Sequence, residues 1–271
     1  MSREIDRRDF TINRVTPARE TELRAIASDV SSRLPGTHRV QIAGLDATTG
    51  NPRAIASESA PAERGNYIQR ALDHVRNISP ALGLAATQPA EFVADPHVQQ
   101  TTSAAVTVHL QQNYKGIPIF HATQAVRFAP DGTLKDTVGS SVTVAQELAV
   151  SHKLSIQEAV LKAAQHIAVP DADEQGTTDQ FGQPLNLTTV DLTGFVPKVI
   201  ATFRDKTDQP TVLEAGPFGD EIKGSLVWFP LGEDLRLAWD FIIAMPNYEG
   251  QYRAIVDADS GEILYCHQLV K

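Results

Sequence analysis

The alternation of hydrophobic and polar residues is most regular between residues 104 and 134, where it predicts two strands joined by a turn. Val106, Val108 and Leu110 fall on one face and polar residues on the other, the period of two expected of a half-buried strand. Tyr-Lys-Gly at 114–116 interrupts the run, which then resumes until Pro-Asp-Gly at 130–132 turns the chain again. This stretch predicts a scaffold, because it contains no catalytic side chain.

Helices alternate with strands in the rest of the first half. A first helix is predicted to begin at Thr16, whose hydroxyl suits a cap, with Pro17 at the first helical position, and to end at Pro-Gly of 35–36. The other predicted elements are a hairpin of residues 39–46 and 53–57, a helix over 63–77, a loop over 88–102 and a strand over 134–144.

The second half reads as one helix followed by strands. Ser155 and Glu158 have the spacing of a capping box, in which each side chain satisfies a backbone donor of the other. After a polar loop over 170–191, strands are predicted at 198–203, 226–229, 235–244, 252–257 and 262–270. The pattern therefore predicts an α+β fold of two domains, residues 1–146 and 147–271, each with helix packed on a mainly antiparallel sheet.

Composition narrows the class of partner. The chain of 271 residues has a net charge of −9, which argues against a nucleic-acid partner, and no apolar run approaches the roughly 20 residues that span a bilayer. Between residues 171 and 240 there are thirteen acidic and five basic side chains. This surplus predicts either a solubilising face or a surface that steers a protein partner electrostatically.

The N-terminus resembles an export signal only superficially. Arg7 and Arg8 form a twin arginine, but charged residues follow where such a signal needs an uncharged apolar region. We therefore expect no export signal in the chain as given. Cys266 is the single cysteine, so no intrachain disulfide can form and the redox compartment stays open.

The sequence contains no recognisable catalytic motif, and we expect no enzymatic activity. The eight histidines never show the helical spacing, with an adjacent glutamate, of a zinc hydrolase. We expect His109 on a strand, His74 on the exposed side of a helix, and His166 at a helix end. No nucleophile elbow, phosphate loop or dinucleotide fingerprint occurs, so no catalytic residue, cofactor or metal is expected.

Two acidic stretches have some of the carboxylates that a calcium loop needs. The stretch at 171–176 has Gly182 where a calcium loop needs its twelfth-position glutamate. The stretch at 257–262 is better explained as a hairpin turn, because Asp and Gly supply the backbone geometry of such turns.

Cys266 and His267 are neighbours in the last predicted strand. Adjacent side chains of a strand point to opposite faces, so these two cannot chelate one ion together. Cys266 is expected to be a small core residue. The alternative is that one of the two occupies a partner's metal as a blocking ligand.

Two groups of motifs carry a family resemblance. The segment QNYKGIPIF followed by FAPDGTL resembles the propeptide motif of fungalysin and thermolysin-like proteases, and Trp239 with YRAIVDADSGEIL resembles the PepSY module that accompanies it. The hairpin at 46–53 and the helix that follows are similar to the start of fungalysin prosegments. The motif residues are Gln112, Tyr114, Lys115, Gly116, Ile117, Pro118, Phe120, Asp131, Gly132, Trp239, Asp257, Gly261 and Glu262. His121 stands where related sequences often have a small residue.

The resemblance covers nearly the whole chain and implies a function. It implies a cystatin/PepSY-like fold, an extracellular location, and a non-catalytic prosegment that inhibits and assists folding of a cognate zinc metalloprotease domain until proteolysis releases it. The protease's metal-binding helix is not in the chain. The tail over 263–271 is expected to meet the protease, with Tyr265, Cys266, His267 and Gln268 as contact residues. The alternative is a stand-alone protein-binding module that uses the same domains, and an enzyme ranks third.

Overall fold

The chain forms two compact units. The structure, a computed structural model, describes residues 3–59, 64–84, 91–170, 188–248 and 250–269. The N-terminal unit comprises Asp9–Leu148 with Gly232–Asp234, and the C-terminal unit comprises Met1–Arg8, Ala149–Leu231 and Leu235–Lys271. Residues 1–8, which the pattern predicts in the first domain, instead belong to the C-terminal unit, because β1 (Ile5–Asp6) pairs with the last strand.

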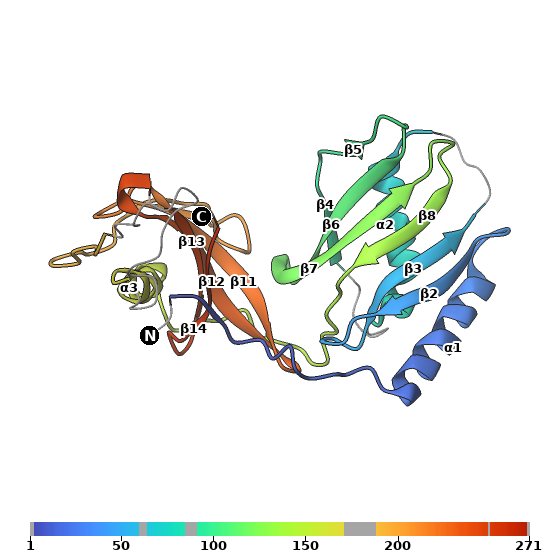
Figure 1. Cartoon of the computed structure of the whole chain (residues 1–271), viewed down its shortest axis with the longest axis horizontal. Helices are drawn as coiled ribbons and strands as arrows, with labels where there is room; N and C mark the ends of the chain where they lie inside the picture. The colour runs from blue at the N-terminus through green and yellow to red at the C-terminus, as the bar shows by residue number, and fades with distance from the viewer. Residues whose placement is uncertain (1–2, 60–63, 85–90, 171–187, 249, 270–271) are drawn as a thin grey trace, which may run out of the picture. The chain divides into compact units, whose positions relative to one another are not determined.

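The sheet of the N-terminal unit is antiparallel (Figure 1). Its strands run in the order β2 (Arg39–Leu45), β3 (Pro52–Glu58), β8 (Leu134–Gly139), β7 (Ile117–Phe128) and β6 (Val106–Tyr114). Both β4 (Glu91–Ala94) and β5 (Gln99–Gln100) pair with β6. The predicted hairpin and the central strands are confirmed, although the strand predicted over 134–144 ends at Gly139.

The predicted loop over 88–102 is wrong, since it contains β4 and β5. Neither strand has an alternating pattern long enough to recognise, and Gln99 and Gln100 are both exposed. Their backbone pairing with β6 makes them strands, and that partner lies outside the local sequence.

Two helices pack on one side of this sheet. In α1 (Pro17–Arg33) the predicted start is confirmed, because the Thr16 hydroxyl accepts a hydrogen bond from the Arg19 N–H at 3.1 Å. The second helix, α2 (Tyr67–Asn77), is followed by the 3₁₀ turn η1 (Ser79–Leu82), and its predicted start at residue 63 lies outside the described residues. Buried side chains from α1, α2, η1 and the sheet form one hydrophobic core.

His74 corrects the expectation of an exposed position on α2. It is 5% exposed, and its Nε2 lies 3.0 Å from the Thr137 hydroxyl on β8. The helical spacing correctly predicted that Val75 and Ile78 lie on the buried face of α2. It did not predict that the buried face also includes His74. His109 does lie on a strand, β6, as predicted.

The sheet of the C-terminal unit has the order β1 (Ile5–Asp6), β14 (Ile263–Gln268), β13 (Gln251–Asp257), β12 (Asp234–Ala244), β11 (Ile222–Leu231), β10 (Thr211–Leu213) and β9 (Val199–Thr202). The pairs β1–β14, β14–β13, β13–β12, β11–β10 and β10–β9 are antiparallel. The strands at β9 and β11 to β14 are confirmed, whereas β1 and β10 were missed and β11 is longer than expected. Most of the predicted loop over 170–191 lies outside the described residues.

One helix, α3 (Ile156–Ile167), packs against β13, and a 3₁₀ turn, η2 (Pro246–Tyr248), precedes that strand (Figure 1). The capping box is confirmed: the Ser155 hydroxyl accepts from the Glu158 N–H, and the Glu158 carboxylate accepts from the Ser155 N–H at 2.8 Å. His166, at the helix end as predicted, has its Nε2 2.9 Å from the Arg3 carbonyl. Helix on antiparallel sheet in both units makes the chain α+β.

Candidate functional site

The Tyr-Lys-Gly turn between β6 and β7 fastens the hairpin to a distant segment. The Leu148 N–H donates to the Tyr114 hydroxyl at 3.1 Å, and Lys115 Nζ donates to the Leu148 carbonyl at 2.8 Å and to a Glu147 oxygen at 3.1 Å. Lys115 and Gly116 both have positive φ, 51° and 73°, which the tight turn requires. These motif residues therefore hold the N-terminal unit together.

Other motif residues of this hairpin are internal. The buried Gln112 amide donates to the Val142 carbonyl at 2.8 Å and accepts from the Val142 N–H at 3.0 Å, which fixes the segment after β8. Ile117 and Phe120 are buried, with Pro118 half-buried between them in sequence. None of these side chains offers a surface to a partner.

His121 marks a bulge in β7. Its φ is 56°, and the pairing of β6 with β7 shifts register at this point. The imidazole stacks on Phe120 with ring centroids 3.8 Å apart. A left-handed backbone disfavours a side chain with a Cβ, which gives a physical reason why a small residue would suit this position.

The Asp-Gly turns of both motifs serve the backbone. An Asp131 oxygen accepts from the Thr133 N–H at 2.9 Å, and Gly132 has a φ of 84°. In the same way Asp257 accepts from the N–H groups of residues 259 and 260 at 2.9 and 2.8 Å, and Gly261 has a φ of 75°. The hairpin-turn interpretation of 257–262 is confirmed. The other acidic stretch, 171–176, lies outside the described residues.

Two further motif residues fix the start of α3 and the end of the chain. Trp239 is buried on β12, and its indole N–H donates to the Leu154 carbonyl at 3.1 Å, just before α3. The Glu262 carbonyl accepts from the Asp257 N–H at 2.9 Å, while its carboxylate lies 3.5 Å from Arg7. A functional surface must therefore be sought among residues outside the motifs.

The predicted contact residues of the tail lie in β14 and divide between its two faces. Cys266 is fully buried, with the buried Leu264 on the same face, and Gln268 is half-buried. His267 is exposed, and Tyr265 is half-buried. The expectation that Cys266 and His267 point to opposite faces is confirmed. Cys266 can reach a partner only if β14 leaves the sheet.

The face that carries Tyr265 and His267 continues across β13 and β12. His267 is paired with Arg253, which is paired with Ile242. Arg253 donates to both carboxylate oxygens of Asp240, from Nε to Oδ1 at 2.9 Å and from Nη2 to Oδ2 at 2.6 Å. Burial raises the pKa of Asp240, and the guanidinium of Arg253 opposes that effect. A fixed ion pair therefore lies beside the exposed imidazole.

The N-terminal segment completes this face from β1. Asp6 is paired with Tyr265 and binds Arg8 at 2.6 Å, while the Arg8 guanidinium lies 5.8 Å from the ring centroids of both Tyr265 and Phe229. Glu4 lies 3.5 Å from His267 Nδ1. We call this surface the outer face; it consists of Glu4, Asp6, Arg8, Asp240, Ile242, Arg253, Tyr265 and His267.

Of the residues on the outer face, only Tyr265 and His267 are among the contact residues predicted from the sequence. The alternation of charged residues around Ile5 is a strand signal, although two residues are too few to recognise as one. Chemically the face offers an aromatic ring, guanidinium groups and an imidazole on a rigid sheet. Tyr and Arg are enriched where proteins bind one another.

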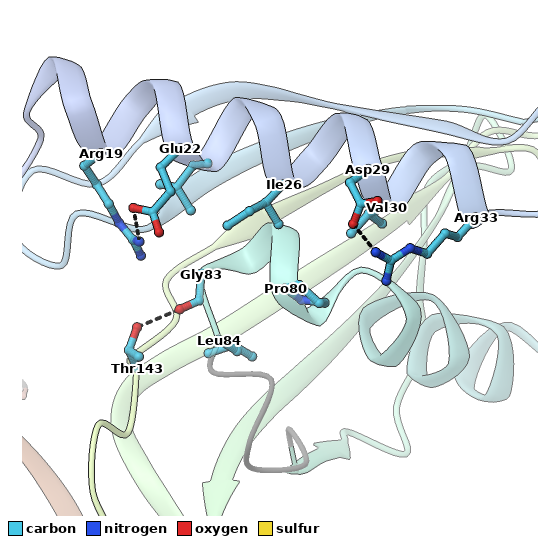
Figure 2. A pocket seen from close by; sticks show the side chains of 11 residues that line it. Arg19, Glu22, Ile26, Asp29, Val30, Arg33, Pro80, Gly83, Leu84 and Thr143 are labelled. Carbon is cyan, nitrogen blue, oxygen red and sulfur yellow. Dashed lines mark hydrogen bonds and ion pairs between the residues drawn. The ribbon is translucent and has the colours of Figure 1, made fainter.

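The N-terminal unit also contains a groove (Figure 2). It has a volume of about 460 Å³ and lies between α1 and η1, with Leu23 and Ile26 among its apolar lining. The charged side chains along α1 pair with one another, Arg19 with Glu22 and Arg33 with Asp29. These pairs occupy the groups that a ligand would need.

Within the described ranges, no group of three or more His, Cys, Asp or Glu side chains is placed to hold a metal ion. In the same part of the chain, no helix has both the length and the apolar character to cross a membrane.

The chain shows a weak structural similarity to a known protein. No protein-family model matches the chain, and a search of curated proteins found no match. Among solved structures the chain is similar to the Bacillus megaterium YpeB C-terminal domain, with 12% sequence identity and a TM-score of 0.34 over 93% of this chain and 98% of that one. A similarity of this size carries no argument about function.

Proposed function

We propose that the chain is the non-catalytic prosegment of a fungalysin/thermolysin-like zinc metalloprotease, which it keeps inactive and helps to fold. The resemblance supplies the family, and the structure supports it by giving each motif residue a definite role in the fold. The observation that carries the proposal is the outer face, where the tail presents Tyr265 and His267 beside the fixed Arg253–Asp240 pair.

Rigidity makes such a face suitable for an inhibitor and folding template. A surface that binds the folded protease but not its unfolded chain stabilises the folded state by mass action. When both are part of one polypeptide, the effective concentration is on the order of millimolar, so modest contacts suffice. The hydrogen bonds between Arg253 and Asp240 fix both side chains before binding and so reduce the entropy lost on binding.

The outer face also favours one of the two proposed blocking ligands. A neutral imidazole binds zinc through a ring nitrogen, and His267 is exposed. The thiol of Cys266 lies on the inner face and is fully buried. In the proposed complex His267 approaches the protease's metal site, and Cys266 stays in the core.

Inhibition in trans tests the proposal. The purified chain is added to a separately folded fungalysin-type protease encoded by the same genome, and peptide hydrolysis is followed. We expect inhibition at micromolar concentration or below. The double variant Tyr265→Ala/His267→Ala should inhibit at least about tenfold more weakly, the loss of one hot-spot contact. As a control, His97→Ala, an exposed change in the N-terminal unit, should inhibit like the parent. A folded chain that leaves the protease fully active at saturation would contradict the proposal.

A second candidate, a stand-alone protein-binding module, is favoured by the edge strand β9. Val196, Ile200 and Phe203 are 70%, 53% and 52% exposed on and beside this strand. Apolar edge strands are sites of strand addition unless they are protected. Replacing Ile200 by Lys separates the candidates: the change should abolish binding to a partner that docks on β9, and it should leave inhibition by the outer face unchanged.

A further inference from the structure

Two histidines are stacked inside the N-terminal unit. His38 lies just before β2 and His74 lies on α2, and their rings are 5.5 Å apart between centroids with an interplanar angle of 25°. His74 bonds Thr137 through Nε2, but its buried Nδ1 has no hydrogen-bond partner within the described residues. The same holds for the buried Nε2 of His38.

On the described elements that surround the stack, the carboxylates that would balance the charge of an added proton are exposed or paired with other side chains. The hydroxyl of Ser57, on β3, is also buried without a partner among the described residues. Arg39, next to His38, is a further cation, and Glu58, opposite Arg39 in the register, is exposed. The carboxylates of the elements packed around the stack are bound elsewhere: Asp29 to Arg33 on α1, Asp73 to Arg76 on α2, and Asp136 on β8 to Arg127.

Protonation of the stack therefore conflicts with the fold. A second proton on either ring would create a buried cation beside the other ring, and protonation of both rings would place two cations against each other. Burial, and secondarily the neighbouring His38, lowers the pKa of His74 to about 3 from its usual 6.5. Burial, and secondarily Arg39, also lowers the pKa of His38.

We propose that the stacked pair of His38 and His74 is an acid-sensitive switch, which stabilises the N-terminal unit while both rings are neutral and weakens it on acidification. The switch is a property of this unit alone and does not depend on the proposed protease partner. If the chain is a prosegment, the switch supplies a way to weaken its hold in an acidic compartment.

The sign and size of the effect follow from proton binding. The unfolded chain protonates His74 near pH 6.5 and the folded unit near pH 3, so acid favours the unfolded state throughout that window. Stability from neutral His74 is fully present above about pH 6.5 and is lost as the pH falls. Between pH 7 and pH 5 the unfolding equilibrium constant should rise about 25-fold through His74 alone.

The test uses the full chain, whose two tryptophans, Trp228 and Trp239, both lie in the C-terminal unit. Urea unfolding is measured at pH 7 and pH 5, with tryptophan fluorescence reporting the C-terminal unit and methyl NMR signals of Ile55 and Val75 reporting the N-terminal unit. His74→Gln and His38→Gln should each flatten the pH dependence of the N-terminal unit, whereas the exposed His97→Gln should not.

An NMR titration of the His74 ring tests the proposal even if the His74→Gln variant does not fold. In the wild-type chain the ring signals of His74 should stay unshifted from pH 8 to pH 5. A titration midpoint near 6.5, or a pH dependence that both glutamine variants leave unchanged, would overturn the proposal.

Discussion

Ile5 and Cys266 are direct neighbours across the antiparallel pair β1 and β14, although they come from opposite ends of the chain. Both ends of the polypeptide thus build the same sheet. The N-terminal segment also carries Arg3, which is 1% exposed within the C-terminal unit. The first residues are therefore part of the scaffold behind the outer face.

Removing the Arg3 side chain should destabilise the C-terminal unit. Its Nη1 donates to the buried Tyr252 hydroxyl at 3.2 Å and its Nε to the Val169 carbonyl at 3.1 Å, so truncation removes both hydrogen bonds and leaves a void where the buried Arg3 side chain lay. We expect Arg3→Ala to lower the free energy of unfolding by about 3 kcal/mol, measured by tryptophan fluorescence in urea. Arg7→Ala, a half-exposed neighbour, should cost less than about 0.5 kcal/mol. Equal losses for the two variants would contradict this role.

The Arg253–Asp240 pair should show strong coupling. Arg253→Met leaves the Asp240 carboxylate partly buried without its partner, and we expect a loss of about 2 kcal/mol, less than a fully buried pair would show. Adding Asp240→Leu to that variant should restore most of the loss, because no unpaired charge remains. A double-mutant cycle in urea measures the coupling. Additive losses would show that the two side chains act independently.

The Cys266 thiol should be protected in the folded chain. Because the side chain is fully buried in β14, an aromatic disulfide reagent should react only as fast as the strand opens, and rapidly in denaturant. The absorbance of the aromatic thiolate released from the reagent, followed over time, gives the reaction rate under native conditions and in denaturant. Fast reaction under native conditions would mean that β14 detaches readily, and it would make Cys266 available as a blocking ligand.

Gly83 should tolerate no side chain. Its φ is 78°, and a Cβ would come within 2.2 Å of the Asn51 side-chain oxygen, whose amide donates to the Ser141 carbonyl at 3.1 Å. We expect Gly83→Ala to cost about 3 kcal/mol in the N-terminal unit, as strain plus displacement of Asn51. Gly36 has a φ of 61° with open space around it, so Gly36→Ala isolates the backbone strain at about 1 kcal/mol. Circular dichroism in urea measures both, and the tryptophan transition should not move.

Much of the fold follows from local sequence. Thr16 and Ser155 predicted helix starts because capping depends on residues within one turn. The Asp-Gly turn at 131–132 and the alternation around Val108 predicted β6, β7 and β8, because turn geometry and strand alternation also depend on residues close in sequence. The missed strands β1, β4, β5 and β10 have at most four residues each, too short for a period to show.

For the candidate site, the sequence by itself determined that Cys266 and His267 point to opposite faces of a strand, because the strand period of two is local. The tertiary structure confirms the prediction that Cys266 lies in the core, on a sheet whose strand β13 packs against α3. It alone brought Glu4, Asp6 and Arg8 beside Tyr265, and it alone placed His74 against His38. These contacts join distant parts of the chain. They depend on the register of the sheet and on how the helices pack, and the spacing of neighbouring residues predicts neither the register nor the packing.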